Sequence, residues 1–259
     1  MPHRDLPASG ARGRDPGEPG SDRVEPAPDA AIPAALRAAA TDLFGPGLAL
    51  AESYAGRLVT DGVVRGLIGP REAPRIWDRH LLNCAAVAPL VPAGSYVVDV
   101  GSGAGLPGIV LAIARPDLTV VLVESLARRT AFLDEVVEAL GLRGRVIVVR
   151  ARAEEVAAAP AMFHVKHCDV VTARAVAPLD RLAGWCLPLA KVGGRLLAFK
   201  GASAADEVVE HEPTIARLGG SPPEIIECGT GLLPEPTTVV SIIRERMVRP
   251  AGASRRRRP

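Results

Sequence analysis

Glycines crowd one short stretch in the first half of the chain. Residues 97–108 read VVDVGSGAGLPG, in which a β-branched run precedes Gly101, Gly103 and Gly105. Glycine can take positive φ and lets a ligand approach bare backbone, and Leu106 begins an apolar run compatible with a helix. A strand, a tight turn and a helix in this order point helix N-terminal amides at a ligand above the strand end. The stretch therefore predicts a nucleotide-type pocket.

Two acidic residues narrow the choice of ligand for this turn. Gly103, Gly105 and Gly108 satisfy the dinucleotide pattern GxGxxG, and Glu124 follows at about the interval of a ribose-binding acid. Asp99, however, precedes the first glycine of a GxGxG core by two residues, which is the arrangement of S-adenosylmethionine-dependent methyltransferases. We interpret Asp99 and the turn as handling the amino-acid part of that cofactor, and Glu124 as accepting from its ribose hydroxyls. A nicotinamide dinucleotide and a purely structural turn stay open as alternatives.

Three basic side chains stand where they could reach the same pocket. Arg174 leaves a buried strand in the segment TARAV, and Lys200 ends the following strand. Both should lie at the carboxyl edge of the sheet, where open α/β folds bind ligands. His80 belongs to the helical segment WDRHLLN, which we expect to pack before the first strand. The residue types alone leave a structural or surface role open for all three.

Two other groups of polar residues have simpler explanations. The segment RAEE at residues 152–155 could flank an adenine, but acids also favour an ordinary helix N-terminus, and that is the better interpretation of the bare sequence. His164, His167 and Cys168 are metal-binding types, yet no fourth ligand lies near them in the sequence. We therefore expect no metal site.

Composition sets the class of protein. The 259 residues are 48% hydrophobic but only 3% aromatic, so the core should consist of aliphatic side chains, and a broad aromatic platform for single strands is excluded. The net charge of +2 provides no global basic field. The four cysteines form no CxxC pair and should be buried free thiols. Without a spanning apolar run or a signal-peptide pattern, we expect a cytoplasmic protein.

The order of predicted elements indicates an α/β fold with appendages. We expect a disordered tail at 1–31, a helical cap at 32–93, a catalytic α/β domain at 94–246 and a basic disordered tail at 247–259. The cap should contain two short helices broken near Gly45 and Pro46, and another helix from roughly Pro74 to Leu90. Beyond the glycine turn, strands and helices alternate until a hairpin-like finish. This pattern predicts a mostly parallel seven-stranded sheet whose last strand is antiparallel.

Taken together, the motifs resemble one known family. The chain is similar to the bacterial small-subunit ribosomal RNA guanine-N7 methyltransferases, also called the glucose-inhibited division protein B family, over roughly residues 32–244. The matching segments are WDRHLLNC at 77–84, VVDVGSGAGLPG at 97–108, ARPDLTVVLVESLARRTAFL at 114–133, RAEE at 152–155, ARAVAPLD at 173–180 and AFKG at 198–201. The resemblance implies a class I, Rossmann-like methyltransferase fold.

The resemblance also implies a reaction and a cofactor site. The reaction would be methyl transfer from S-adenosylmethionine to N7 of one guanine in 16S rRNA, beside the decoding centre. Gly101 and Leu106 would line the cofactor, Ala153 and Glu154 would border its adenine, and Arg174 would close the site. The two tails, the segment 162–167 and the arginines 255–258 fall outside the resemblance, so it assigns them no role.

The expected mechanism needs no general base, because guanine N7 is a lone-pair acceptor without a proton. We expect Arg174, Lys200, Arg79 and His80 to hold phosphate or the base O6. The modest charge favours a structured partner, the small ribosomal subunit or its precursor, bound by a monomer. Competing hypotheses are a methyltransferase for small molecules, an NAD-dependent oxidoreductase, and an rRNA-binding assembly factor without activity.

The segment MFHVKH at residues 162–167 supports an inference about the gene. One of its possible codon spellings, ATG TTT CAC GTG AAA CAT, equals its own reverse complement. The core of that string resembles the centromere-like sites of bacterial chromosome-partition proteins. Our hypothesis is that a DNA element shaped this segment, and that the peptide is a tolerated surface insertion.

Overall fold

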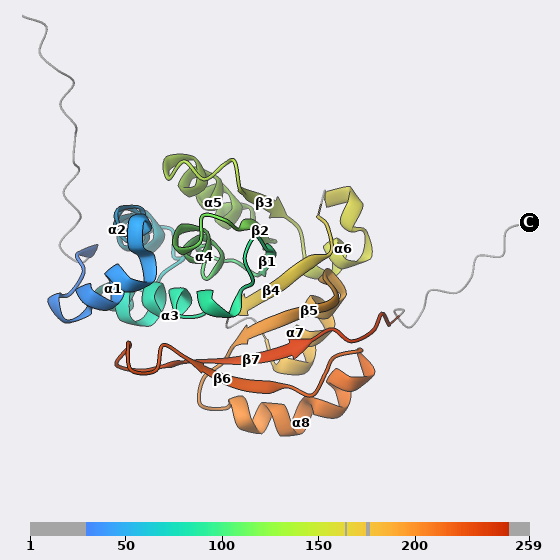
Figure 1. Ribbon diagram of the computed structural model, residues 1–259. Helices are drawn as coiled ribbons and strands as arrows, with labels where there is room; N and C mark the ends of the chain where they lie inside the picture. Colours follow the sequence, from blue (N-terminus) through green and yellow to red (C-terminus); the bar gives the residue numbers. More distant parts are fainter. Residues whose placement is uncertain (1–29, 164, 175–176, 249–259) are drawn as a thin grey trace, which may run out of the picture.

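The computed structural model describes residues 30–163, 165–174 and 177–248 (Figure 1). Of the tails predicted at 1–31 and 247–259, residues 1–29 and 249–259, including the arginines 255–258, lie outside the described residues. Ala30, which we assigned to the N-terminal tail, is buried, and its carbonyl accepts a 2.8 Å hydrogen bond from the indole N–H of Trp77. The described fold therefore begins inside the predicted tail.

A seven-stranded sheet forms the centre of the described chain. Its order is β3-β2-β1-β4-β5-β7-β6; β7 pairs antiparallel with β5 and β6, while the pairs among β1 to β5 are parallel. The prediction of a mostly parallel sheet with an antiparallel last strand is confirmed. The strands are β1 (Tyr96–Val100), β2 (Thr119–Glu124), β3 (Val146–Arg150), β4 (Cys168–Arg174), β5 (Ala190–Phe199), β6 (Glu224–Cys228) and β7 (Thr237–Ile243).

Helices cover both faces of this sheet, which explains why the central strands read as continuous apolar runs. Alternate residues of β1 belong to different hydrophobic cores. Val97 packs in the core on the face that the cap covers, and Val98 packs in the core on the other face. The helices of the α/β part are α4 (Gly108–Ala114), α5 (Ala127–Ala139), α6 (Ala153–Ala158), α7 (Leu179–Cys186) and α8 (Ala204–Arg217). All four cysteines are buried and free, as predicted.

The N-terminal cap packs against α4 and shares one hydrophobic core with it. Its two first helices, α1 (Arg37–Phe44) and α2 (Leu48–Arg57), are separated at Gly45–Gly47, as predicted. Tyr54 of α2 is fully buried and donates a 2.7 Å hydrogen bond to the carbonyl of Ala104 in the glycine turn. The cap therefore braces the backbone that follows β1.

The prediction of a continuous helix between residues 74 and 90 is wrong. The chain forms a 3₁₀ turn at Ala73–Arg75, a π-helical turn at Ile76–Leu81, the short helix α3 (Leu82–Ala85) and a second 3₁₀ turn at Ala88–Leu90. Pro89 in the second 3₁₀ turn lacks the N–H that a continuing helix needs, whereas Pro74 stands in the first turn of the segment, where proline is tolerated. Wide π turns are rare and frequently occur at functional sites.

Candidate functional site

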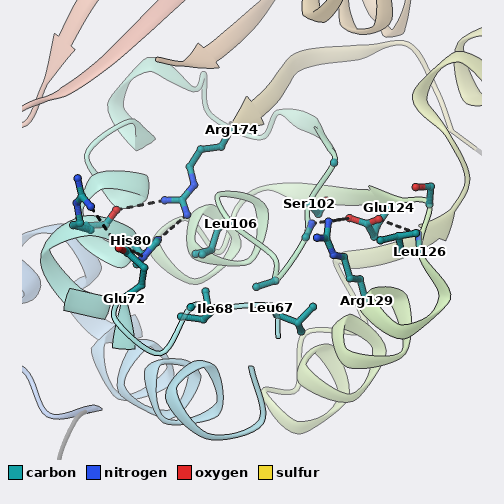
Figure 2. A pocket seen from close by; sticks show the side chains of 16 residues that line it. Leu67, Ile68, Glu72, His80, Ser102, Leu106, Glu124, Leu126, Arg129 and Arg174 are labelled. Carbon is teal, nitrogen blue, oxygen red and sulfur yellow. Dashed lines mark hydrogen bonds and ion pairs between the residues drawn. The ribbon is translucent and has the colours of Figure 1, made fainter. Parts of the chain in front are cut away.

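A cavity of about 750 Å³ lies where the cap meets the carboxyl ends of β1, β2 and β4 (Figure 2). Four groups of residues line it: Leu67, Ile68, Gly69, Glu72, Arg79 and His80 from the cap; Gly101, Ser102, Gly103, Ala104 and Leu106 from the glycine turn; Glu124, Ser125, Leu126 and Arg129 around the end of β2; and Arg174 at the end of β4. Ligands of open α/β sheets bind at this edge. The cavity is therefore the candidate site.

The glycine turn presents bare backbone to this cavity. Gly101 and Gly103 have φ of 69° and 58°, a conformation that side chains with a Cβ rarely adopt. At Gly105, a Cβ would collide with the Ile109 side chain of α4 and lie 2.9 Å from the hydroxyl oxygen of Tyr54. Gly105 itself is buried and does not line the cavity, so it makes room for α4 and the cap rather than for a ligand.

Glu124 fixes the turn from the neighbouring strand. The side chain is almost fully buried, and one carboxylate oxygen accepts the amide hydrogen of Gly103 at 3.0 Å. The other oxygen accepts the amide hydrogen of Leu126 at 2.9 Å. Each oxygen keeps lone pairs for further donors, which is what a pair of ribose hydroxyls would offer.

Arg129 of α5 completes this side of the cavity. Its guanidinium lies 3.5 Å from the Glu124 carboxylate, and its Nε is buried without a hydrogen-bond partner in the described part of the chain. A buried donor without a partner is costly, so a ligand acceptor at this position would stabilise the site. The donors and acceptors around Glu124 and Arg129 therefore fit an adenosine-type cofactor, and S-adenosylmethionine is one.

Asp99 lies behind the turn and not in the cavity. It is fully buried; one oxygen accepts the amide hydrogen of Gly108 at 3.1 Å, and the other accepts from the Thr172 hydroxyl at 2.8 Å. Burial raises the pKa of Asp99 to about 6, and the hydrogen bond from Thr172 partly offsets this rise. The geometry thus gives Asp99 a bracing role, where we had expected direct contact with the cofactor.

The opposite side of the cavity holds Arg174, His80 and Glu72 (Figure 2). Nη2 of Arg174 lies 2.7 Å from Nδ1 of His80, and Nε2 of His80 lies 3.1 Å from a carboxylate oxygen of Glu72. Burial, together with the nearby Arg174 charge, lowers the pKa of His80 to about 4, although Glu72 opposes this shift. His80 is therefore neutral near pH 7.

Three further expected site residues do not line this cavity. Ala153 and Glu154 begin α6, where the acids belong to the first turn of an ordinary helix N-terminus. Lys200 donates to the Glu207 carboxylate at 2.6 Å and to the Ala177 carbonyl at 3.0 Å. Its ammonium group thus holds the segment after β4 against α8.

Sequence reasoning missed the wall that the cap contributes. Leu67, Ile68 and Gly69 follow a second π turn, and Glu72 stands in the next turn; no motif in the sequence marks them. Leu126 and Arg129 could have been found, because they directly follow the strand end that carries Glu124. The cap is thus part of the site as well as its support.

Two negative findings concern the described residues. Among them, no group of three or more histidine, cysteine, aspartate or glutamate side chains could hold a metal ion; His164 lies outside this set. None of the described helices is long and apolar enough to cross a membrane.

The sheet order, the glycine turn after β1 and the acid at the end of β2 define a class I S-adenosylmethionine-dependent methyltransferase. A solved O-methyltransferase from neocarzinostatin biosynthesis has the same fold, with a TM-score of 0.50 and 17% identity over 82% of this chain and 74% of that chain.

Comparison by sequence gives the family. Residues 48–233 match the model of GidB, described as rRNA small subunit methyltransferase G. A protein of that name from Salinispora arenicola is 65% identical over 88% of this chain and 96% of its own length. Another from Corynebacterium efficiens is 53% identical over 86% and 95%. The chain belongs to the GidB family and is a methyltransferase, as its motifs predicted.

Proposed function

We propose that the protein methylates N7 of one guanine in 16S rRNA of the small ribosomal subunit or its precursor, acting as a cytoplasmic monomer. The observation that supports this most strongly is the family match over residues 48–233, since the relatives are named as methyltransferases of small-subunit rRNA. The cavity adds a site whose lining suits an adenosine-type cofactor on one side and an anionic substrate on the other.

The cofactor would extend across the cavity from Glu124 towards Arg174. Glu124 would accept from the ribose hydroxyls, Gly101 and Gly103 would let the cofactor approach the backbone, and Leu106 would pack against it between the two sides (Figure 2). When bound, S-adenosylmethionine supplies an electrophilic methyl group on a sulfonium. Asp99 would contribute from beneath the cavity by holding the glycine turn. The cavity does not include Ala153 and Glu154, which begin α6.

The protein's own contribution would be alignment without proton transfer. Guanine N7 has no proton to lose, so in-line attack on the methyl group needs no base. His80 suits that scheme, because both of its ring nitrogens are already engaged and it stays neutral. Holding the nucleophile, the methyl carbon and the sulfur in line can lower a barrier by up to about 7–11 kcal/mol.

Arg174 and Arg79 would hold the RNA at the edge of the base. The methylated base gains positive charge, so a cation set against N7 would oppose the reaction. A guanidinium is better used on a phosphate or on O6, and Arg174 has no carboxylate partner among the described residues. Lys200, held by Glu207, would support the segment after β4 and not the RNA.

The decisive experiment maps N7-methylguanine in 16S rRNA from cells with and without this gene. Loss of one modified guanine, restored by the gene, is the expected result. Purified protein should also transfer a labelled methyl group to subunits from the deletion strain. Calorimetry with S-adenosylmethionine and with NAD separates a methyltransferase from an oxidoreductase. An unchanged modification pattern would refute the proposal.

A further inference from the structure

The contacts of Arg174 are unusual for a charged residue at a binding site. Its Nη2 is 2.7 Å from Nδ1 of His80, and its Nη1 lies 3.4 Å from the carbonyl oxygen of Arg79 and 3.7 Å from Sγ of Cys84. All three partners are neutral acceptors, and all three come from the wide turn and short helix at residues 76–85. The cap thus fixes the direction of the guanidinium without neutralising its charge.

The hydrogen bond to Arg174 determines the tautomer of His80. A guanidinium has donors only, so Nδ1 must present a lone pair and the ring proton must be on Nε2. Nε2 then donates to the Glu72 carboxylate at 3.1 Å. His80 keeps only 12% of its side chain exposed, so solvent is a poor substitute for this acceptor. Glu72 therefore selects the tautomer that Arg174 requires.

We propose that Glu72 is a positioning residue, which acts through His80 to hold Arg174 in the orientation that receives the anionic part of the substrate complex. The inference rests on the proposed function, in which Arg174 holds the RNA edge. Glu72 itself also lines the cavity, and its other oxygen lies 3.5 Å from Nη1 of Arg79. That second pair is exposed, with half of the Arg79 side chain accessible, and contributes little, so the effect of Glu72 should run through His80.

The loss of Glu72 should change the orientation of Arg174 without removing its charge. With no acceptor at Nε2, the imidazole of His80 can move its proton to Nδ1. The Nδ1–H group and an N–H group of the Arg174 guanidinium would then be two donors facing each other. Arg174 would then leave His80. Glutamine at position 72 still offers an oxygen to Nε2–H, so Glu72→Gln should retain part of the function that Glu72→Ala loses.

A double-mutant cycle tests this order of action. We expect Glu72→Ala and His80→Leu each to lower the methyl-transfer rate on ribosomal subunits by about tenfold, and the double variant to be no slower than His80→Leu alone. Glu72→Gln should lie between Glu72→Ala and the wild type. Additive losses in the double variant, or a wild-type rate in Glu72→Ala, would overturn the proposal.

Asp78, on the π-helical turn that carries His80, offers a matched control. Its side chain is 31% exposed against 35% for Glu72, and it pairs with Arg75 at 2.6 Å outside the cavity. Asp78→Ala should keep the wild-type transfer rate. An equal loss in Asp78→Ala would show that any acidic truncation in this part of the cap is harmful, and would overturn the specific role of Glu72.

Nitrogen-15 NMR of the His80 ring gives a readout that does not depend on catalysis. The wild type should show a protonated Nε2 and an unprotonated Nδ1 at pH 7, and Glu72→Ala should shift the population towards protonated Nδ1. The opposite tautomer in the wild type would overturn the proposal even if the enzyme is active. A wild type with the expected tautomer but no transfer to RNA would refute the proposed function instead.

Discussion

The carboxylate of Glu124 accepts the amide hydrogen of Gly103 at 3.0 Å, and so ties the end of β2 to the glycine turn that follows β1. The two residues are neighbours because β1 and β2 pair in parallel, with Val100 opposite Val123. The same carboxylate faces the cavity, where it can serve the turn and a ligand together.

Replacement of Glu124 should therefore weaken cofactor binding. Glu124→Ala removes the acceptor for Gly103 and Leu126 and for ribose hydroxyls, and we expect the dissociation constant for S-adenosylmethionine to rise at least about tenfold by calorimetry. Glu138→Ala on the exposed face of α5 is the control, and it should bind normally. Unchanged affinity in Glu124→Ala would place the cofactor elsewhere.

Replacement of Arg174 should separate binding from folding. Arg174→Ala removes a half-buried guanidinium that contributes no ion pair among the described residues, so the melting temperature should change little. Methylation at limiting RNA should fall at least about tenfold, because the RNA edge loses a charge-assisted contact. Arg174→Lys should recover little, since an ammonium lacks the planar fork. Unchanged turnover in Arg174→Ala would remove this residue from the site.

The buried carboxyl of Asp99 predicts a pH dependence of stability. Its pKa of about 6 in the folded protein exceeds the ordinary 3.8, so between these values the unfolded chain is ionised while the folded protein keeps the proton. Stability that Asp99 contributes at low pH is thus lost as pH rises through 6, by about 3 kcal/mol in total.

Asp99→Asn tests this dependence. The amide oxygen can still accept from Gly108, and the amide nitrogen can donate to the Thr172 hydroxyl. In denaturant unfolding, the wild type should lose stability relative to Asp99→Asn between pH 4 and pH 7.5. The Asp99→Asn variant should keep its affinity for the cofactor. A parallel course of the two proteins would contradict the raised pKa, and a folded variant that binds no cofactor would show that Asp99 touches it.

Lys200 should affect stability and not catalysis. Lys200→Met leaves the Glu207 carboxylate and the Ala177 carbonyl without their cation, and we expect a loss of about 1–2 kcal/mol in the free energy of unfolding. Lys191→Met, at an exposed pair with Asp169, should cost less. A folded Lys200→Met protein with a strongly reduced transfer rate would restore the catalytic role that we first expected.

The segment 162–167 gives a prediction about the gene. Met162 is 77% exposed between α6 and β4, but Val165 of the same segment is 5% exposed and packs in the core, so the segment is not wholly a surface insertion; His164 lies outside the described residues. The codons should spell ATG TTT CAC GTG AAA CAT, and sequencing the gene decides it. Any other spelling would end the hypothesis of a DNA element.

The sequence by itself determined the sheet, the glycine turn and the position of Glu124. These features depend on local spacing: β-branched runs form strands, glycines permit positive φ, and an acid at a strand end lies at the ligand edge of a parallel sheet. The family match over residues 48–233 agrees with that interpretation.

Which polar residues share the cavity follows from long-range packing and not from local sequence patterns. Asp99 and Glu124 are acids on neighbouring strands and lie on the same face of the sheet, because Asp99 pairs with Leu122, two residues before Glu124. Glu124 is closer to the carboxyl edge, so its side chain enters the cavity while that of Asp99 lies beneath the turn. Glu72 meets His80 and Arg174 only when the cap packs on the sheet. Such contacts join residues distant in sequence, and no local pattern encodes them.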